Sequence, residues 1–153
     1  MDVKILGGLL KRIGRFSMSN FQDRLKLQKY IYLLQAFGLY LGFRFNWYIY
    51  GPYSPDLARD GFELAKQYPN VPEVKFMEEK DETKFSEFIG FLHPNEDNTD
   101  WLEMIASLHF LKKMYPGRSK GEIFEKVRNK QPYLNDEQKC EACWEYLKTY
   151  KLI

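Results

Sequence analysis

The sixteen residues 45–60, FNWYIYGPYSPDLARD, place a run of aromatic side chains beside a turn and the start of a helix. Before the glycine, hydrophobic residues alternate with polar or hydroxyl-bearing ones, and this period of two predicts a half-buried strand over residues 43–50. Gly51 and Pro52 then predict the turn that ends the strand. We expect one face of the strand to be buried and to carry Phe43, Phe45, Trp47 and Ile49, and the other to carry Arg44, Asn46, Tyr48 and Tyr50.

The residues after this turn predict a helix. Ser54 is a natural N-cap, because its hydroxyl can accept a hydrogen bond from an early helical N–H group. Pro55 suits the first helical position, where an amide N–H would have no partner. Asp56 adds negative charge near the positive end of the helix dipole. We expect this helix to run to about Gln67.

The residues before the strand predict a longer helix, which starts at SNFQ (residues 19–22) and ends near Phe37. Ser19 and Gln22 have the spacing of a capping box, and Gly38 follows the C-terminal end. Apolar side chains recur along it at helical spacing, at Leu27, Tyr30, Ile31, Leu34 and Phe37.

The remainder of the chain also favours helices. One is predicted at the N-terminus between Asp2 and Gly14, and another after a capping box of Ser119 with Glu122. Apolar periodicity predicts three more, over residues 85–93, 101–115 and 136–147, while residues 73–77 predict a short second strand. We therefore predict a mainly α fold, a single domain over residues 1–153 with about seven helices and a small β element, winged-helix-like at most.

Composition limits the classes of function. The 23 Lys and Arg residues nearly balance the 21 Asp and Glu residues, and a net charge of +2 does not indicate a polyanion binder. No apolar run has the length of a membrane span, and the first helix predicts an amphipathic segment rather than a signal peptide. Two cysteines do not indicate a disulfide scaffold, so we expect a cytoplasmic protein.

The pair Cys140 and Cys143 in CEAC is the strongest candidate for metal or redox chemistry. A structural zinc site needs four ligands, whereas His93 and His109 are far from the pair in the sequence. Both cysteines share helical spacing with Trp144, which predicts core packing. The sequence contains no nucleophile elbow, phosphate-binding glycine loop or paired-acid motif, so we expect no metal, no cofactor and no enzymatic activity.

The tyrosines around the predicted turn are the best candidates for a binding surface. Tyr48 and Tyr50 fall on the face of the strand opposite its predicted core, and Tyr53 follows the turn. Exposed clusters of tyrosine are typical of protein contacts, since they offer large area at low entropic cost. The alternative is that another helix covers these tyrosines. Composition alone favours neither the binding surface nor the covered arrangement.

Two segments together resemble the Panacea antitoxin-domain family and, more closely, the related YwgA-like prokaryotic proteins. They are KLQKYIYLLQ at residues 26–35 and YGPYSPDL at residues 50–57. The resemblance covers about residues 20–65 and implies a helical domain with a small sheet and no known catalysis. In the Panacea group it implies neutralisation of a toxin by direct binding, and in some members an adaptor that delivers a partner to a protease. The matching residues are Lys26, Leu27, Gln28, Lys29, Tyr32, Tyr50, Gly51, Pro52, Tyr53, Ser54 and Pro55.

The sequence therefore favours a non-enzymatic module that binds a partner protein, such as a toxin. A winged-helix nucleic-acid binder is the alternative, because the first third of the chain is rich in Lys and Arg. An enzyme built from scattered residues is a third alternative, and the aromatic content is consistent with a homodimer. We expect the partner-binding residues to be Lys26, Lys29, Tyr48, Tyr50, Gly51, Pro52, Tyr53 and Ser54.

Overall fold

The computed structural model describes residues 2–153 and confirms the mainly helical prediction. Over this range it contains seven α-helices, three short 3-10 helices and one two-stranded sheet. In chain order the elements are α1 (Val3–Ile13), α2 (Phe21–Ala36), β1 (Asn46–Tyr48), β2 (Gly51–Tyr53), α3 (Pro55–Ala65), η1 (Tyr68–Asn70), α4 (Glu79–Leu92), η2 (His93–Asn95), α5 (Thr99–Met114), α6 (Lys120–Lys130), η3 (Pro132–Leu134) and α7 (Glu137–Thr149).

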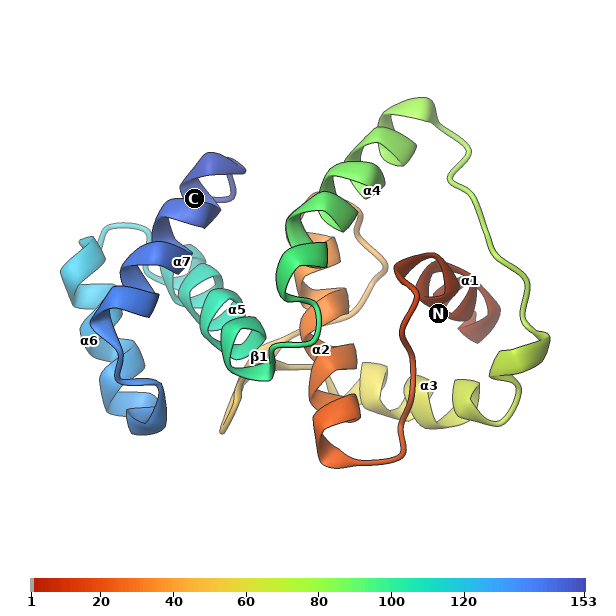
Figure 1. The fold of residues 1–153 in the computed structure, drawn as a ribbon, viewed down its shortest axis with the longest axis horizontal. Coiled ribbons are helices and arrows are strands. Elements are labelled where there is room, and N and C mark those ends of the chain that lie inside the picture. The colour runs from red at the N-terminus through yellow and green to blue at the C-terminus, as the bar shows by residue number, and fades with distance from the viewer. Residues whose placement is uncertain (1) are drawn as a thin grey trace.

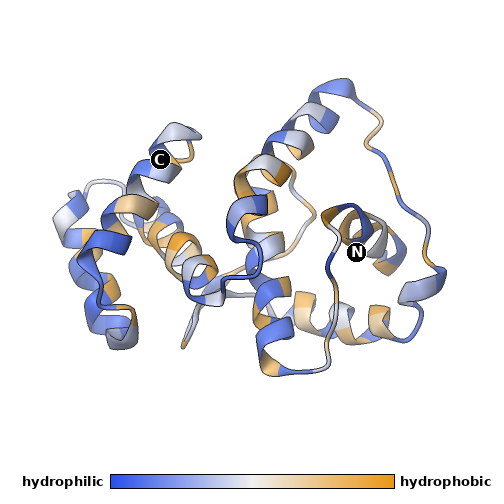
Figure 2. Cartoon of the chain, in the orientation of Figure 1, coloured by the Kyte–Doolittle hydropathy of each residue, from blue (hydrophilic) through white to orange (hydrophobic). Residues whose placement is uncertain are grey.

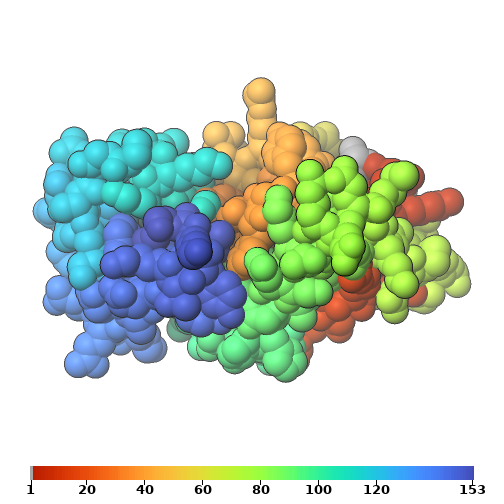
Figure 3. Space-filling view, turned by 90° about the horizontal axis from the view of Figure 1, so that it is seen from above, coloured from red at the N-terminus to blue at the C-terminus, as the bar shows by residue number. Residues whose placement is uncertain are grey.

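The helices form two groups that meet at α2 and α5. Helices α1 to α4 lie in one half of the molecule and α5 to α7 in the other (Figures 1 and 3). Helix α2 packs against α5, and strand β2 contacts both of these helices. The hairpin of β1 and β2 thus projects from the junction of the two groups (Figure 1).

Helix α5 is the centre of the C-terminal group. Hydrophobic residues are concentrated along it (Figure 2), and buried side chains occur all round its axis because it contacts α2, α6 and α7. On α7, Cys140 and Cys143 are free thiols buried beside Trp144, which confirms their predicted core packing. Burial raises the pKa of Cys140 to about 11 and that of Cys143 to about 12, so both thiols stay protonated at neutral pH.

Several predicted helix ends are confirmed. Ser54 caps α3 with its hydroxyl accepting from Leu57 N, and Pro55 is the first helical residue. Gly14 ends α1 in the left-handed conformation, at φ 96°. Ser119 and Glu122 form the predicted capping box at the start of α6.

The predicted cap of α2 is wrong by one residue. Asn20 is the N-cap, and its side-chain oxygen accepts from Asp23 N at 2.9 Å. Ser19 instead belongs to a local turn, in which Ser17 Oγ lies 2.9 Å from Ser19 Oγ and accepts from Ser19 N. Because asparagine is at least as good a cap as serine, the neighbouring residue can take over the role.

The predicted single strand over residues 43–50 is also wrong, because only Asn46–Tyr48 form a strand, which is the first arm of a hairpin. β1 pairs with β2 in antiparallel register, Trp47 opposite Pro52, and the turn lies at Ile49 and Tyr50. Gly51 and Pro52 are therefore strand residues rather than the turn. A proline is tolerated here because each strand of a two-stranded sheet has a free edge. Ile49, which was expected to be buried, is 74% exposed at the tip.

The second predicted strand, at residues 73–77, does not form. This segment is extended backbone held by side chains instead of by a neighbouring strand. Arg12 donates to Val74 O at 3.1 Å, and Phe76 N donates to the Glu82 carboxylate at 2.6 Å. Over residues 2–153, no helix is both long enough and apolar enough to cross a bilayer.

Candidate functional site

The tip of the hairpin presents aromatic and aliphatic side chains to solvent. Tyr48 is 45% exposed and Tyr50 is 40% exposed, while Tyr53 is partly buried. The rings form two contacting pairs on one surface, since Tyr48 lies 5.0 Å from Tyr53 and Tyr50 lies 4.9 Å from Phe21, measured between ring centroids. Tyr133 of η3 continues it, 6.3 Å from Tyr50. The C-terminal helices therefore do not cover the predicted tyrosines.

Beside this tip lies a groove of about 240 Å³ between α2, α3 and the hairpin. We call it the aromatic groove. Its lining is mostly apolar and includes side chains of α2 and α3 that the sequence prediction did not include, among them Phe21, Arg24 and Phe62. The residues that define it are Phe21, Arg24, Tyr48, Tyr50, Tyr53 and Phe62.

The side chains from α2 share one face of that helix. Phe21, Arg24, Leu25 and Gln28 follow the i, i+3, i+4, i+7 spacing of a helical stripe. The sequence prediction used only the stripe that faces the core and left this second one unassigned. The apolar residues Phe21 and Leu25 on this second stripe are the signal that could have identified the groove wall.

Gln28 of α2 holds the backbone at the end of the hairpin from the protein interior. Its Nε2 donates to Ser54 O at 3.0 Å, and its Oε1 accepts from Ser54 N at 2.8 Å. This pair of bonds satisfies both backbone groups of Ser54, much as a neighbouring strand would. Ser54 is completely buried, so the expectation that it meets a partner is wrong, and its role is to cap α3 and end the hairpin.

Lys29 is the second anchor, and its predicted role as a surface contact is also wrong. It is only 2% exposed, and its Nζ donates to Pro52 O at 2.8 Å. Burial lowers the pKa of Lys29 to about 8, against the opposing influence of Glu103 on α5. The ammonium group is therefore still mostly charged at neutral pH, and it holds the second strand of the hairpin against α2.

Glu103 is a buried acid that the sequence analysis missed. Its carboxylate accepts from Gln131 Nε2 at 2.6 Å and from the Tyr133 hydroxyl. The same hydroxyl lies 3.3 Å from Ile49 O, at the tip of the hairpin. Burial raises the pKa of Glu103 despite these donors and the positive charge of Lys29. This network connects α5 and η3 to the hairpin.

Gly51 and Pro52 are buried, so they shape the hairpin and are not exposed to contact a partner as predicted. Gly51 adopts φ 92°, a conformation that favours glycine. A Cβ atom at this position would lie 2.5 Å from Ser107 Oγ on α5. The hairpin can therefore approach α5 only because residue 51 has no side chain.

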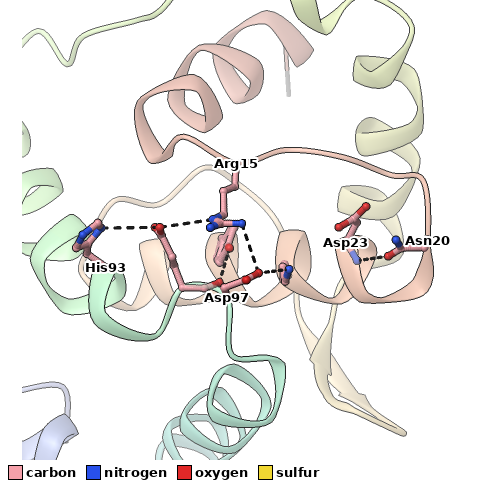
Figure 4. Close-up of polar contacts among 8 residues, drawn as sticks. Arg15, Asn20, Asp23, His93 and Asp97 are labelled. Carbon is pink, nitrogen blue, oxygen red and sulfur yellow. Dashed lines mark hydrogen bonds and ion pairs between the residues drawn. The ribbon is translucent and has the colours of Figure 1, made fainter.

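Lys26 does not join the tyrosines, because it points to the other side of α2. Its Nζ donates to the Asp97 carboxylate at 2.5 Å, and Arg15 Nη1 lies 3.4 Å from the same carboxylate (Figure 4). Together the hydrogen bond from Lys26 and the nearby charge of Arg15 lower the pKa of Asp97. Lys26 lines a separate polar cleft of about 290 Å³, shared with Asp23 and Tyr30.

Five of the predicted contact residues thus line the aromatic groove, but Lys29 and Gly51 are buried, and only Tyr48, Tyr50 and Tyr53 present side chains to solvent there. Among residues 2–153, no group of His, Cys, Asp and Glu side chains is arranged to hold a metal ion. Comparison with protein-family models, with curated proteins and with solved structures gives no match for this chain. The resemblance to the Panacea group stays a prediction that rests on the two sequence segments.

Proposed function

We propose that this protein is a non-enzymatic module that binds a partner protein at the hairpin tip and the aromatic groove. The observation that carries the proposal is the exposed row of Tyr48, Ile49 and Tyr50 on a hairpin whose backbone is fixed by buried side chains. Tyrosine and arginine are the residue types that most often dominate binding energy at interfaces. A surface already held in one conformation also loses less entropy on binding.

The resemblance to Panacea-type proteins gives this proposal an antitoxin-like or adaptor-like form. Of the matching residues, Gln28, Lys29 and Ser54 hold the hairpin in place from the interior. Tyr50 and Tyr53 are the matching residues that line the groove with aromatic rings. On this proposal the buried matching residues supply a rigid support for the hairpin. The exposed aromatic residues recognise the partner, for example a toxin.

Ion pairs within the chain make nucleic acid a less suitable partner. Arg12 pairs with Glu82 at 2.7 Å, and both Arg15 and Lys26 pair with Asp97. Phosphate groups would have to compete with these carboxylates for Arg12, Arg15 and Lys26. Binding to nucleic acid would fall steeply with salt, because phosphate contacts release counterions.

The test compares tagged wild-type protein with a Tyr48→Ala/Tyr50→Ala double variant in pull-downs from the native cells, with bound proteins quantified by mass spectrometry. Tyr40→Ala is the matched control, since Tyr40 is 70% exposed and lies outside the aromatic groove. We expect the double variant to lose the specific partners and Tyr40→Ala to keep them. If a folded double variant keeps every partner, the proposal is wrong. A salt-sensitive electrophoretic shift with nucleic acid would instead support the alternative.

A further inference from the structure

The aromatic groove contains a charged side chain, Arg24, that takes no part in holding the hairpin in place. Arg24 is partly buried in the groove wall, and its Nη1 donates to Met18 O at 3.1 Å. No carboxylate among residues 2–153 lies within ion-pair distance of its guanidinium group, in contrast to Arg12, which pairs with Glu82. A guanidinium has five N–H donors, so most of those of Arg24 are free for a ligand.

The charges lining the groove are all of one sign. Arg24 lies in the wall, and none of the described lining residues is acidic. Lys29 also borders the groove, but it is only 2% exposed and its Nζ bonds Pro52 O, so Arg24 is the charge that a ligand can reach. The remaining lining is apolar or aromatic apart from Gln28, whose amide already bonds Ser54. The groove is therefore complementary to an apolar group that carries a negative charge.

The size of the groove distinguishes between kinds of ligand. Its volume of about 240 Å³ falls below the range of roughly 300–1,000 Å³ that is usual for sites of drug-sized molecules and cofactors. It is better matched to one large side chain inserted by a protein. Phe21 and Phe62, which are 43% and 52% exposed, provide apolar contact area for such a segment on α2 and α3.

We infer that the aromatic groove binds an acidic amphipathic segment of the partner protein, with one large apolar side chain in the groove and a nearby Asp or Glu carboxylate on Arg24. This inference rests on the proposed function and specifies the chemistry of the partner. The planar guanidinium can form two parallel bonds to the carboxylate, and the surrounding rings reduce its exposure to water. The apolar side chain supplies affinity, while the carboxylate fixes the register of the segment.

The experiment selects a displayed library of random peptides against the full-length protein. We expect the enriched peptides to share a large apolar residue and an Asp or Glu within one helical turn of it. The best peptide is then compared with a twin in which that acid is replaced by its amide. The twin should bind wild-type protein at least about tenfold more weakly, and the two peptides should bind Arg24→Gln equally.

Arg128→Gln serves as the matched control, because Arg128 is also partly buried, lies on α6 and has no carboxylate within ion-pair distance among the described residues. It should retain the preference for the acidic peptide. Enriched peptides without an acid, or an amide twin that binds wild-type protein as well as its parent, would overturn the inference. So would a wild-type dimer in sedimentation experiments that Arg24→Gln dissociates, since the groove would then hold a second copy of this chain.

The outcomes separate this inference from the proposed function. If the Tyr48→Ala/Tyr50→Ala variant loses its cellular partners but selected peptides show no acidic preference, the chemistry assigned to Arg24 is wrong and the binding module remains. If wild-type protein retains neither a cellular partner nor a peptide, both proposals fail.

Discussion

The buried and exposed sides of the hairpin are built from opposite kinds of residue. The interior side is held by polar and charged groups, namely Gln28, Lys29 and the network of Glu103. The solvent side carries Tyr48, Ile49 and Tyr50. This arrangement reverses the usual rule of apolar residues inside and polar residues outside. It indicates that the buried, or inner, side fixes the conformation of the hairpin. The exposed, or outer, side is then free to recognise a partner.

The reversal has a physical reason. A hairpin of two short strands has marginal stability by itself. Hydrogen bonds from Gln28 and Lys29 to backbone carbonyls are directional, so they fix both position and orientation, which apolar contacts alone do not. Apolar side chains can then be exposed at the tip without collapsing onto the core. Contiguous exposed apolar surface of this kind often marks an interaction site.

Among substitutions on the buried side of the hairpin, we expect Lys29→Ala to be the most destabilising. The change leaves Pro52 O without its partner, removes the positive charge near Glu103 and opens a cavity. We expect a loss of about 4–5 kcal/mol in the free energy of unfolding, as for other disrupted buried charges. Urea denaturation followed by circular dichroism measures it. Lys66→Ala, in an exposed ion pair with Glu63, is the control and should change stability by less than about 0.5 kcal/mol.

Gly51→Ala should be the next largest effect. Alanine would be strained at φ 92°, and its Cβ would lie 2.5 Å from Ser107 Oγ. Strain and overpacking together should remove about 3–4 kcal/mol of stability. Gly90→Ala in α4 is the matched control, since a Cβ there meets nothing within 4 Å. We expect that variant to gain about 0.5–1 kcal/mol, so equal values for the two variants would contradict the close approach of α5.

A third test uses pH to examine the buried contact between Tyr32 of α2 and His109 of α5. Tyr32 Oη and His109 Nδ1 are 2.7 Å apart in the interior, and burial lowers the pKa of His109 to about 4. Between pH 4 and the ordinary value of 6.5, the unfolded state binds the proton and the folded state does not. Stability should therefore fall as the pH drops through this window, by up to about 3 kcal/mol.

The matched variant for this test is His109→Gln, which has no group that titrates in the same window. The difference in unfolding free energy between wild type and variant is measured at pH 7 and again near pH 4.5. Carboxylates common to both proteins cancel in that difference. Parallel pH dependences for the two proteins would show that His109 is not buried in its neutral form.

The sequence predicted the parts of the hairpin region that depend on neighbouring residues. Ser54 and Pro55 begin α3 as expected, because a cap and a first-turn proline act within a few residues. The register of the hairpin could not be predicted in this way. It depends on Gln28 and on Glu103, which are far from the hairpin in the chain and are brought to it by the packing of α2 and α5.

The predicted site was correct for side chains that face outward and wrong for those that turn inward. Sequence spacing does not distinguish a lysine that bonds a backbone carbonyl from one that faces solvent, and Lys29 was assigned to the wrong class for this reason. Arg24 was noted only as part of a general basic bias. Its position one turn from Phe21, on a helical stripe separate from the one used in the prediction, is the pattern that would have placed it in the groove.

We expect Ile49→Ser to have the smallest effect on stability. It is therefore the sharpest test of whether the outer side of the hairpin serves recognition. Ile49 is 74% exposed at the turn, so replacing it should change the free energy of unfolding by less than about 0.5 kcal/mol. If the outer side serves recognition, the same substitution should weaken capture of cellular partners, since it removes an exposed apolar side chain between Tyr48 and Tyr50. Equilibrium denaturation and quantitative pull-down of one purified variant measure the two effects together. A clear loss of stability would mean that the tip contributes to the fold, whereas unchanged capture would mean that recognition is confined to the groove.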